Sequence, residues 1–277
     1  MGSELLPSHE AAADRQVTCK RQQGKRDKGQ GISIRGIHQV GTPTIRNVAI
    51  SFEMTPISVD NHKYNKYIVF MEGKQINKIL LLPAGPRKTA ALAEWLQNLY
   101  QARETPPVLV GGGAVELFTG GAYVTGDMDL VGTVPAAVGK VLSDVGFTRH
   151  GRHWIHEEGR IFFEFPSTSL SPSEKAEDRI FHGHRVLIVS PEDLLVDRLS
   201  AWSHWESELD GVNAYLLYRA LVAELDHDRI QSRCLEEDVS GPFDRLENFF
   251  REHQGEIPDG SELEEWARNR EGKKGAR

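Results

Sequence analysis

The sequence predicts a mixed α/β (α+β) protein, in which a sheet of mixed strand direction is flanked by helices and followed by a helical subdomain. β-rich apolar runs occur over residues 47–105, apolar runs alternate with helix-compatible segments over 106–190, and helical spacing dominates after residue 191. We therefore divide the chain into a basic arm (1–46), a small strand-rich module plus a helix (47–105), a sheet-bearing core (106–190), a helical subdomain (191–254) and a polar tail (255–277).

The composition excludes several classes of protein. The 277 residues carry 33 basic and 40 acidic side chains, so the molecule lacks the positive charge of a protein that wraps nucleic acid. Two distant cysteines, Cys19 and Cys234, exclude a disulfide framework and a paired-cysteine zinc site. No stretch approaches the roughly 20 apolar residues of a membrane span, and the N-terminus lacks the apolar core of a secretory signal. We expect a cytoplasmic protein without a membrane partner.

The arm over residues 1–46 is rich in Gly, Gln, Lys and Arg. Between Arg15 and Arg46 it has eight basic side chains against one acid, Asp27. Such a stretch buries little apolar surface, so we expect disorder. Two interpretations stay open, because a basic arm can attract RNA or another phosphate polymer, or can be a solvated leader.

The module after the arm is predicted from three β-rich runs. These are Val48–Phe52, Tyr67–Met71 and Ile79–Leu82, and Glu72-Gly73-Lys74 is typical of a turn that joins the last two as a hairpin. A helix with apolar residues between Ala90 and Leu99 follows.

The predicted core begins with a strand, a glycine turn and a short helix. Its further elements are a strand, a helix and three more strands. In order, we expect strand Val108–Val110, helix Ala114–Phe118, strand Met128–Val131, a helix over 135–145, and strands Trp154–His156, Ile161–Phe165 and Val186–Val189.

The subdomain begins at Ser190-Pro191-Glu192-Asp193, which supplies an N-cap, a first-turn proline and two first-turn acids. We expect helices over 191–206, 211–225 and 243–252, followed by a polar tail that frays. Trp202 and the aromatic residues of the next helix are assigned to helix packing.

Chemistry is concentrated around the glycine turn. Gly111, Gly112 and Gly113 stand where a strand gives way to a helix, so the free amides at the helix N-terminus can bind a phosphate. Glutamate at residue 116 stands where a dinucleotide fingerprint needs its third glycine, and no Gly-Lys-Ser/Thr follows, which excludes a P-loop. A glycine triplet by itself also fits a tight turn.

Two carboxylates follow at a spacing of two. On a strand, Asp127 and Asp129 project from one face while Met128 and Leu130 enter the core. Like charges held side by side repel, and Mg²⁺ with a triphosphate would neutralise them. The alternative is a solvated turn after Thr125-Gly126.

Glu164 is a single acid within an apolar strand, where an ionised group is costly unless it is paired or bound to metal. We predict that it is the third metal ligand. The alternative is an ion pair with Arg160 or Arg149. The histidines at 150, 153, 156, 182 and 184 are interpreted as structural or surface residues.

Gly111-Gly112, followed after fourteen residues by Asp127-Met128-Asp129-Leu130, resembles the signature of the nucleotidyltransferase superfamily related to DNA polymerase beta. The likeness covers roughly residues 107–205 and is greatest to the minimal bacterial and archaeal branch, which includes abortive-infection and toxin–antitoxin nucleotidyltransferases. In that family a Gly-Gly or Gly-Ser turn holds the phosphates, the Asp-x-Asp pair binds metal, and a third acid helps activate the attacking hydroxyl.

By resemblance, Gly111 and Gly112 hold the phosphates, and Asp127, Asp129 and Glu164 are catalytic and bind the metal. Gly113 and Thr125 lie in the same segment and are counted as nucleotide-binding. Relatives commonly have a lysine near the position of Arg198, which leaves open whether Arg198 contacts phosphate in its place. The spacing before Asp127 is one residue longer than in the family.

The resemblance implies transfer of a nucleoside monophosphate from an NTP to an acceptor hydroxyl, with two Mg²⁺ ions. The acceptor can be RNA, a protein or a small molecule. Two alternatives remain: a toxin that uses this chemistry and is partnered by an antitoxin, and a non-catalytic nucleotide-binding protein with the same fold.

Overall fold

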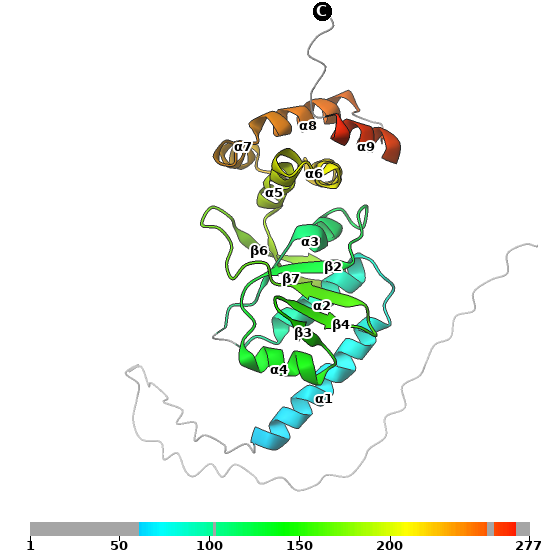
Figure 1. Ribbon diagram of the computed structural model, residues 1–277, viewed down its shortest axis with the longest axis vertical. Helices are drawn as coiled ribbons and strands as arrows, with labels where there is room; N and C mark the ends of the chain where they lie inside the picture. The colour runs from blue at the N-terminus through cyan, green and yellow to red at the C-terminus, as the bar shows by residue number, and fades with distance from the viewer. Residues whose placement is uncertain (1–60, 102–103, 254–257, 270–277) are drawn as a thin grey trace, which may run out of the picture. The chain divides into compact units, whose positions relative to one another are not determined.

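The computed structural model of the chain describes residues 61–101, 104–253 and 258–269 (Figure 1). The predicted basic arm and the predicted strand Val48–Phe52 lie outside these ranges. The described residues form a mixed α/β fold, as the sequence predicts, in which a seven-stranded mixed sheet is accompanied by helices and followed by a helical region. Of the helices in the described ranges, none combines the length and the apolar character that a membrane span requires.

The sheet has the order β3-β4-β5-β2-β1-β7-β6. Strand β2 is parallel to β5 and β1 is parallel to β7, and the other neighbours are antiparallel. The strands are β1 (Val108–Val110), β2 (Asp127–Val131), β3 (Thr148–His150), β4 (His153–His156), β5 (Ile161–Glu164), β6 (Ala176–Phe181) and β7 (His184–Val189). The sequence predicted five of these strands, and it missed β3 and β6, which lie at the two edges.

Helices α1 (Asn61–Leu80), α2 (Pro86–Asn98) and α4 (Ala136–Asp144) lie together on one side of the sheet (Figure 1). Trp95 of α2 stacks on Phe147, and Phe147 stacks in turn on Phe163 of β5, with ring centroids 6.0 and 5.0 Å apart. Met128 and Leu130 of β2 are also buried. The hydrophobic core therefore fills this side, and the alternate residues of β2 and β5 face the other side.

The predicted hairpin over residues 67–82 is wrong. Residues 67–80 are part of the 20-residue helix α1, and Gly73 lies inside that helix rather than in a turn. Ile76 and Ile79 are buried at a spacing of three, whereas Phe70 and Met71 are exposed. An apolar run of four or five residues does not distinguish a strand from one face of a helix. Here packing against α2 stabilises the helix.

The helical region consists of α5 (Pro191–His204), α6 (Glu208–Leu221), α7 (His227–Glu236), α8 (Ser240–Glu252) and α9 (Gly260–Arg268). The predicted start of α5 is confirmed, because the Ser190 hydroxyl accepts a hydrogen bond from the backbone N–H of Asp193 (3.2 Å). Helices α7 and α9 were missed. Residues 260–268 are therefore not a frayed tail, since Leu263, Trp266 and Ala267 are buried there.

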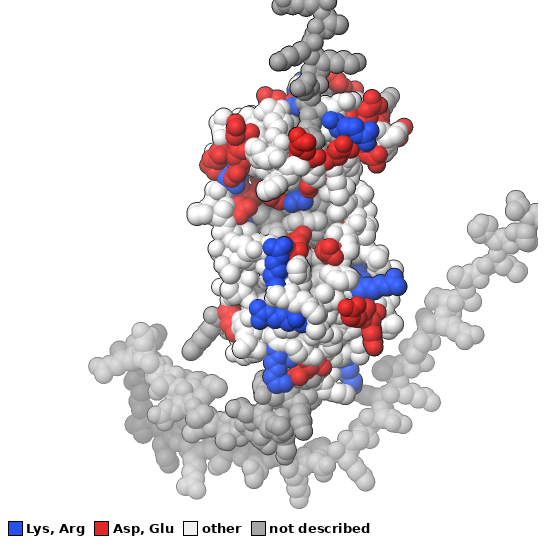
Figure 2. All heavy atoms as spheres, viewed as in Figure 1, with Lys and Arg blue, Asp and Glu red and all other residues white. Residues whose placement is uncertain are grey.

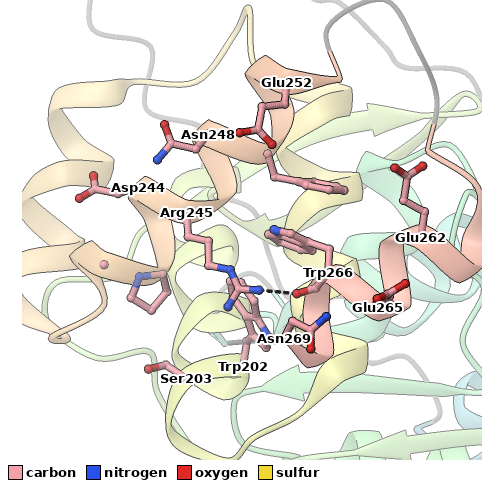
Figure 3. Close-up of a pocket in the computed structure, with 13 residues that line it drawn as sticks. Trp202, Ser203, Asp244, Arg245, Asn248, Glu252, Glu262, Glu265, Trp266 and Asn269 are labelled. Carbon is pink, nitrogen blue, oxygen red and sulfur yellow. Dashed lines mark hydrogen bonds between the residues drawn. The ribbon is translucent and has the colours of Figure 1, made fainter. Parts of the chain in front are cut away.

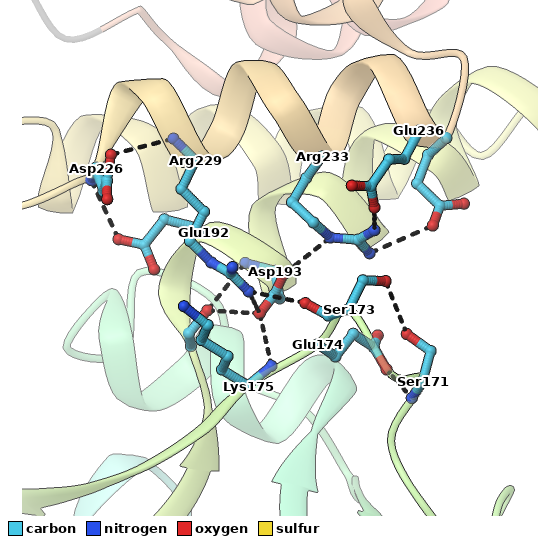
Figure 4. Close-up of polar contacts among 12 residues, drawn as sticks. Ser171, Ser173, Glu174, Lys175, Glu192, Asp193, Asp226, Arg229, Arg233 and Glu236 are labelled. Carbon is cyan, nitrogen blue, oxygen red and sulfur yellow. Dashed lines mark hydrogen bonds and ion pairs between the residues drawn. The ribbon is translucent and has the colours of Figure 1, made fainter.

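Asp193 is the centre of a buried polar network that joins α5 to α7 (Figure 4). Its fully buried carboxylate accepts hydrogen bonds from Arg229 Nη2 (2.5 Å), Arg233 Nε (3.1 Å) and Ser190 Oγ (2.9 Å). It also accepts one from the backbone N–H of Lys175 (2.8 Å). Two cations and two neutral donors thus compensate one buried acid, and they hold the segment before β6 against the helices.

Candidate functional site

The glycine turn connects β1 to α3 (Gly111–Phe118), and α3 begins at Gly111 itself. Gly111 has a φ of +62°, a left-handed conformation that favours glycine. A Cβ on Gly111 would overlap Oδ2 of Asp129. The turn therefore needs glycine at this position both for its backbone conformation and for its close approach to β2.

Asp129 is half-buried beside this turn. Burial raises the pKa of its carboxyl group, and the negative charges of Glu164 and Asp127 raise it further. The backbone N–H of Gly112 and the charge of Arg198 act in the opposite direction. The structure therefore brings the turn, the other two predicted acids and Arg198 within electrostatic reach of the Asp129 carboxylate.

The register of the sheet explains this convergence. Asp129 is opposite Glu164 in the parallel pair of β2 and β5, and opposite Val110 in the antiparallel pair of β1 and β2. Asp127 is opposite Phe162. Because side chains alternate along a strand, Asp127, Asp129 and Glu164 lie on the face away from Met128 and Phe163.

Glu164 has an ion-pair partner other than the two arginines predicted from the sequence. Arg152 Nη2 lies 2.7 Å from Glu164 Oε1, and His153 Nε2 lies 3.3 Å from Oε2. His153 is opposite Glu164 on the neighbouring strand β4, so the contact follows from strand pairing. Arg152 replaces Arg160 and Arg149, the partners expected if Glu164 is structural. The pair is open to solvent, with Arg152 60% and Glu164 26% exposed.

Arg198 of α5 is 17% exposed and lies between two other acids. Its guanidinium donates to Asp210 (2.6 Å) and to the neighbouring Asp197 (2.5 Å). Its Nε is buried and has no hydrogen-bond partner. The positive charge of Arg198 thus lies near Asp129 but is largely compensated by Asp197 and Asp210.

The remaining predicted nucleotide-binding residues differ in their surroundings. A Cβ on Gly112 would lie 3.1 Å from Thr125 Oγ1, which places Thr125 directly beside the turn. Thr125 Oγ1 also accepts a hydrogen bond from the backbone N–H of Asp127 (3.2 Å). Gly113 instead faces the core, where a Cβ would meet Leu109 at 3.2 Å. The need for glycine at 113 is therefore explained by packing.

A pocket of about 700 Å³ adjoins Asp129. Its walls are β1 and β2, the start of α5, and the segment 166–174 that follows β5. Ser167, Ser169 and Ser171 of that segment line it. This wall was not predicted from the sequence, although the serine-rich stretch directly after the strand of Glu164 indicates it.

A larger pocket, of about 1260 Å³, lies between α5, α8 and α9 (Figure 3). The Arg245 guanidinium lies 5.0 Å from the Trp202 ring centre, and it donates a hydrogen bond to the backbone carbonyl of Trp266. None of the predicted site residues lines this pocket. The larger cavity and the cluster of acids are therefore different places in the fold.

Metal-ligand geometry is incomplete in this conformation. Among the described residues, no group of three or more His, Cys, Asp or Glu side chains is arranged to hold a metal ion. The predicted structural histidines have local partners, since His184 lies 2.7 Å from Glu94 and His156 accepts from the backbone of Gly159. On the face in Figure 2, acidic and basic side chains are intermixed, without one continuous basic patch.

Among known proteins, a solved structure is similar to this chain. No family model and no curated protein sequence matches the chain. A solved structure described as an antigenic nucleotidyltransferase-like protein from Paracoccidioides brasiliensis is similar over 65% of this chain and 99% of its own length, with 15% sequence identity and a TM-score of 0.43.

Proposed function

We propose that the chain is a Mg²⁺-dependent nucleotidyltransferase that transfers a nucleoside monophosphate from an NTP to an acceptor hydroxyl. The observation that carries the proposal is the contact between the glycine turn and Asp129 on the same face as Asp127 and Glu164. A helix N-terminus, which could bind a phosphate, and a set of hard oxygen donors are thereby adjacent.

The donor chemistry fits a magnesium site. Asp127 is exposed and Asp129 is half-buried. Burial raises the pKa of Asp129, and the negative charges of Glu164 and Asp127 raise it further, so a cation here would relieve their repulsion. Asp127 and Asp129 would hold the ions, and Glu164 would join them after exchanging its contact with Arg152. When bound, Mg²⁺ neutralises the triphosphate and lowers the pKa of the acceptor hydroxyl.

The chain's own groups would orient the reactants. The amides in the first turn of α3 would face the phosphates, with the helix dipole behind them. Arg198, which lines the same pocket, would supply positive charge after exchanging part of its contact with Asp197 and Asp210. The acceptor oxygen forms a bond to the α-phosphorus as the bond to the bridging oxygen breaks, pyrophosphate leaves, and the acceptor proton passes to solvent.

The acceptor is an RNA, a protein or a small molecule, and the intermixed charges on the face in Figure 2 favour a local contact with RNA over a long RNA track on that face. A protein acceptor or a bound antitoxin would both fit the toxin form of the proposal. In that form, expression of the wild-type chain slows growth and expression of an inactive variant does not.

The test is pyrophosphate release from each of the four NTPs, with Mg²⁺ and cellular RNA or protein as acceptor. The wild type is compared with Asp127→Ala/Asp129→Ala, and Asp178→Ala on the exposed edge strand β6 is the matched control. We expect release by the wild type and by the control, and none above background from the double variant. Equal release from all three proteins would refute the proposal.

A second candidate is a non-catalytic nucleotide-binding protein. It is favoured by the ion pairs that engage Glu164 and Arg198, and by the incomplete metal geometry of the described residues. This candidate predicts NTP binding with no pyrophosphate release at any Mg²⁺ concentration.

A further inference from the structure

Glu116 is the most buried acid next to the candidate site, and the proposed reaction does not use it. It lies on α3, five residues after Gly111, and is 0% exposed. Its Oε2 accepts a hydrogen bond from Thr89 Oγ1 of α2 (3.0 Å), and its Oε1 is buried without a hydrogen-bond partner of ordinary geometry. No cation neutralises it among the contacts that the structure describes. A carboxylate in such surroundings is costly and calls for an explanation.

The contacts of Glu116 lead to the loop that carries the aspartate pair. The backbone carbonyl of Glu116 accepts from the N–H of Gly121 (3.0 Å), near the start of this loop. Burial raises the pKa of the Glu116 carboxyl group, and the hydroxyl of Thr89 and the backbone N–H of Thr125, near the end of this loop, act in the opposite direction. One buried residue therefore contacts both ends of the segment 119–126.

Thr125 transmits this contact to the predicted metal ligand. Its hydroxyl accepts from the backbone N–H of Asp127 (3.2 Å) and lies beside Gly112 of the turn. Asp127 is exposed and is the first residue of β2, where its register partner is Phe162 of β5. The order of contacts is thus Thr89, Glu116, Thr125, Asp127.

We propose that Glu116 is a positioning residue for the metal-binding face: held by Thr89, it fixes Thr125 and thereby the backbone of Asp127 relative to Gly112. This inference rests on the proposed function, and it means that α2, through Thr89, helps to set the geometry of the site. Removing a group that orients a metal ligand without binding the metal itself typically lowers metal affinity or activity by about 10–100-fold.

Two pairs of variants test the inference. Glu116→Ala and Thr89→Val remove the contact, whereas Glu116→Gln and Thr89→Ser keep an acceptor and a hydroxyl. Leu142→Ala, in the buried core on α4, is the control for lowered stability alone. The measurements are the Mg²⁺ concentration for half-maximal pyrophosphate release, and amide hydrogen exchange over residues 119–127.

We expect Glu116→Ala and Thr89→Val to raise the half-maximal Mg²⁺ concentration by about tenfold, and to speed exchange over 119–127 more than elsewhere. Glu116→Gln and Thr89→Ser should stay within about threefold of the wild type on the same scale. Leu142→Ala should lower the melting temperature without moving the Mg²⁺ curve.

Unchanged Mg²⁺ dependence in Glu116→Ala, or exchange over 119–127 like that of the wild type, overturns the inference. If the wild type itself releases no pyrophosphate, the proposed function fails, and the exchange measurement still decides whether Glu116 positions the loop. If Glu116→Ala does not fold, Thr89→Val decides the same question.

Discussion

Gly111 lies directly against the carboxylate of Asp129, although eighteen positions separate the two residues in the sequence. The left-handed backbone of Gly111 and the pairing of Val110 with Asp129 produce this contact. The amides of a helix N-terminus, among them the N–H of Gly112 that interacts with Asp129, are thereby set beside an acid whose pKa is raised by burial and by neighbouring carboxylates. The phosphate and cation site that we propose would thus depend on one turn and one strand register.

Replacing Gly111 by alanine should abolish activity. The new Cβ would overlap Asp129 and would occupy a φ that L-residues rarely adopt. Gly126→Ala is the matched control, because Gly126 adjoins Asp127 but has open space around it. We expect at least about a hundredfold loss of pyrophosphate release for Gly111→Ala, since misplacement of reacting groups by about 1 Å costs that much. Equal activity of the two variants would contradict the assigned role of the turn.

Replacing Asp129 by asparagine should stabilise the protein and inactivate it. The pKa of Asp129 is raised, so the folded state disfavours the ionised form. The resulting cost is fully present above the folded pKa and is relieved as pH falls through that pKa. Thermal unfolding at pH 7 without Mg²⁺ should therefore give a higher melting temperature for Asp129→Asn. Saturating Mg²⁺ should raise the melting temperature of the wild type and not that of the variant. A melting temperature of Asp129→Asn below that of the wild type, at pH 7 without Mg²⁺, would contradict the repulsion among the acids.

Replacing Arg152 by alanine should make the site easier to load with Mg²⁺. Arg152 is exposed and pairs with Glu164 at 2.7 Å, so it competes with a cation for the same carboxylate. Exposed pairs contribute about 0–1 kcal/mol, and we therefore expect the half-maximal Mg²⁺ concentration to fall by no more than about fivefold. Arg149→Ala removes a neighbouring arginine that does not contact Glu164. A rise in the Mg²⁺ requirement with Arg152→Ala would mean that Arg152 binds the nucleotide instead.

Sequence patterns predicted structural features correctly where one local physical cause determines the feature. Ser190-Pro191 predicted the start of α5, because a capping hydroxyl and a first-turn proline act locally. The spacing of Asp127 and Asp129 placed both on one face, because alternation is a property of any strand. The roles of these residues in metal binding remain predictions.

Other features depend on partners that are distant in the sequence. The short apolar runs of α1 predict strands, whereas the packing of these residues on α2 stabilises a helix. The partner of Glu164 is on β4, and strand pairing rather than proximity in the sequence selects Arg152 and His153. The buried contact between Thr89 and Glu116 joins two helices, and the two residues are 27 positions apart. No local sequence pattern predicts it.

Replacing Asp193 by asparagine should destabilise the protein strongly. The variant would leave Arg229 and Arg233 without their buried counter-charge, and breaking a buried pair costs about 3–5 kcal/mol. Burial alone would raise the pKa of Asp193, but Arg229, the backbone N–H of Lys175 and Ser190 together hold it below the ordinary value. The contribution of the ionised carboxylate is therefore complete above the pKa of unfolded aspartate and is lost as pH falls through the lower folded pKa.

Urea unfolding of the wild type and Asp193→Asn at a series of pH values from neutral to acid measures this contribution. The difference in unfolding free energy should be constant near neutral pH and should shrink only at strongly acid pH. Asp178→Asn, which removes an exposed partner of Arg185, is the control and should change stability little at any pH. Because Arg229 also donates to the carbonyl of Ser173, on the segment beside the pocket, Asp193→Asn should weaken NTP binding as well. A variant as stable as the wild type at pH 7 would mean that the two arginines find other partners when the acid is removed.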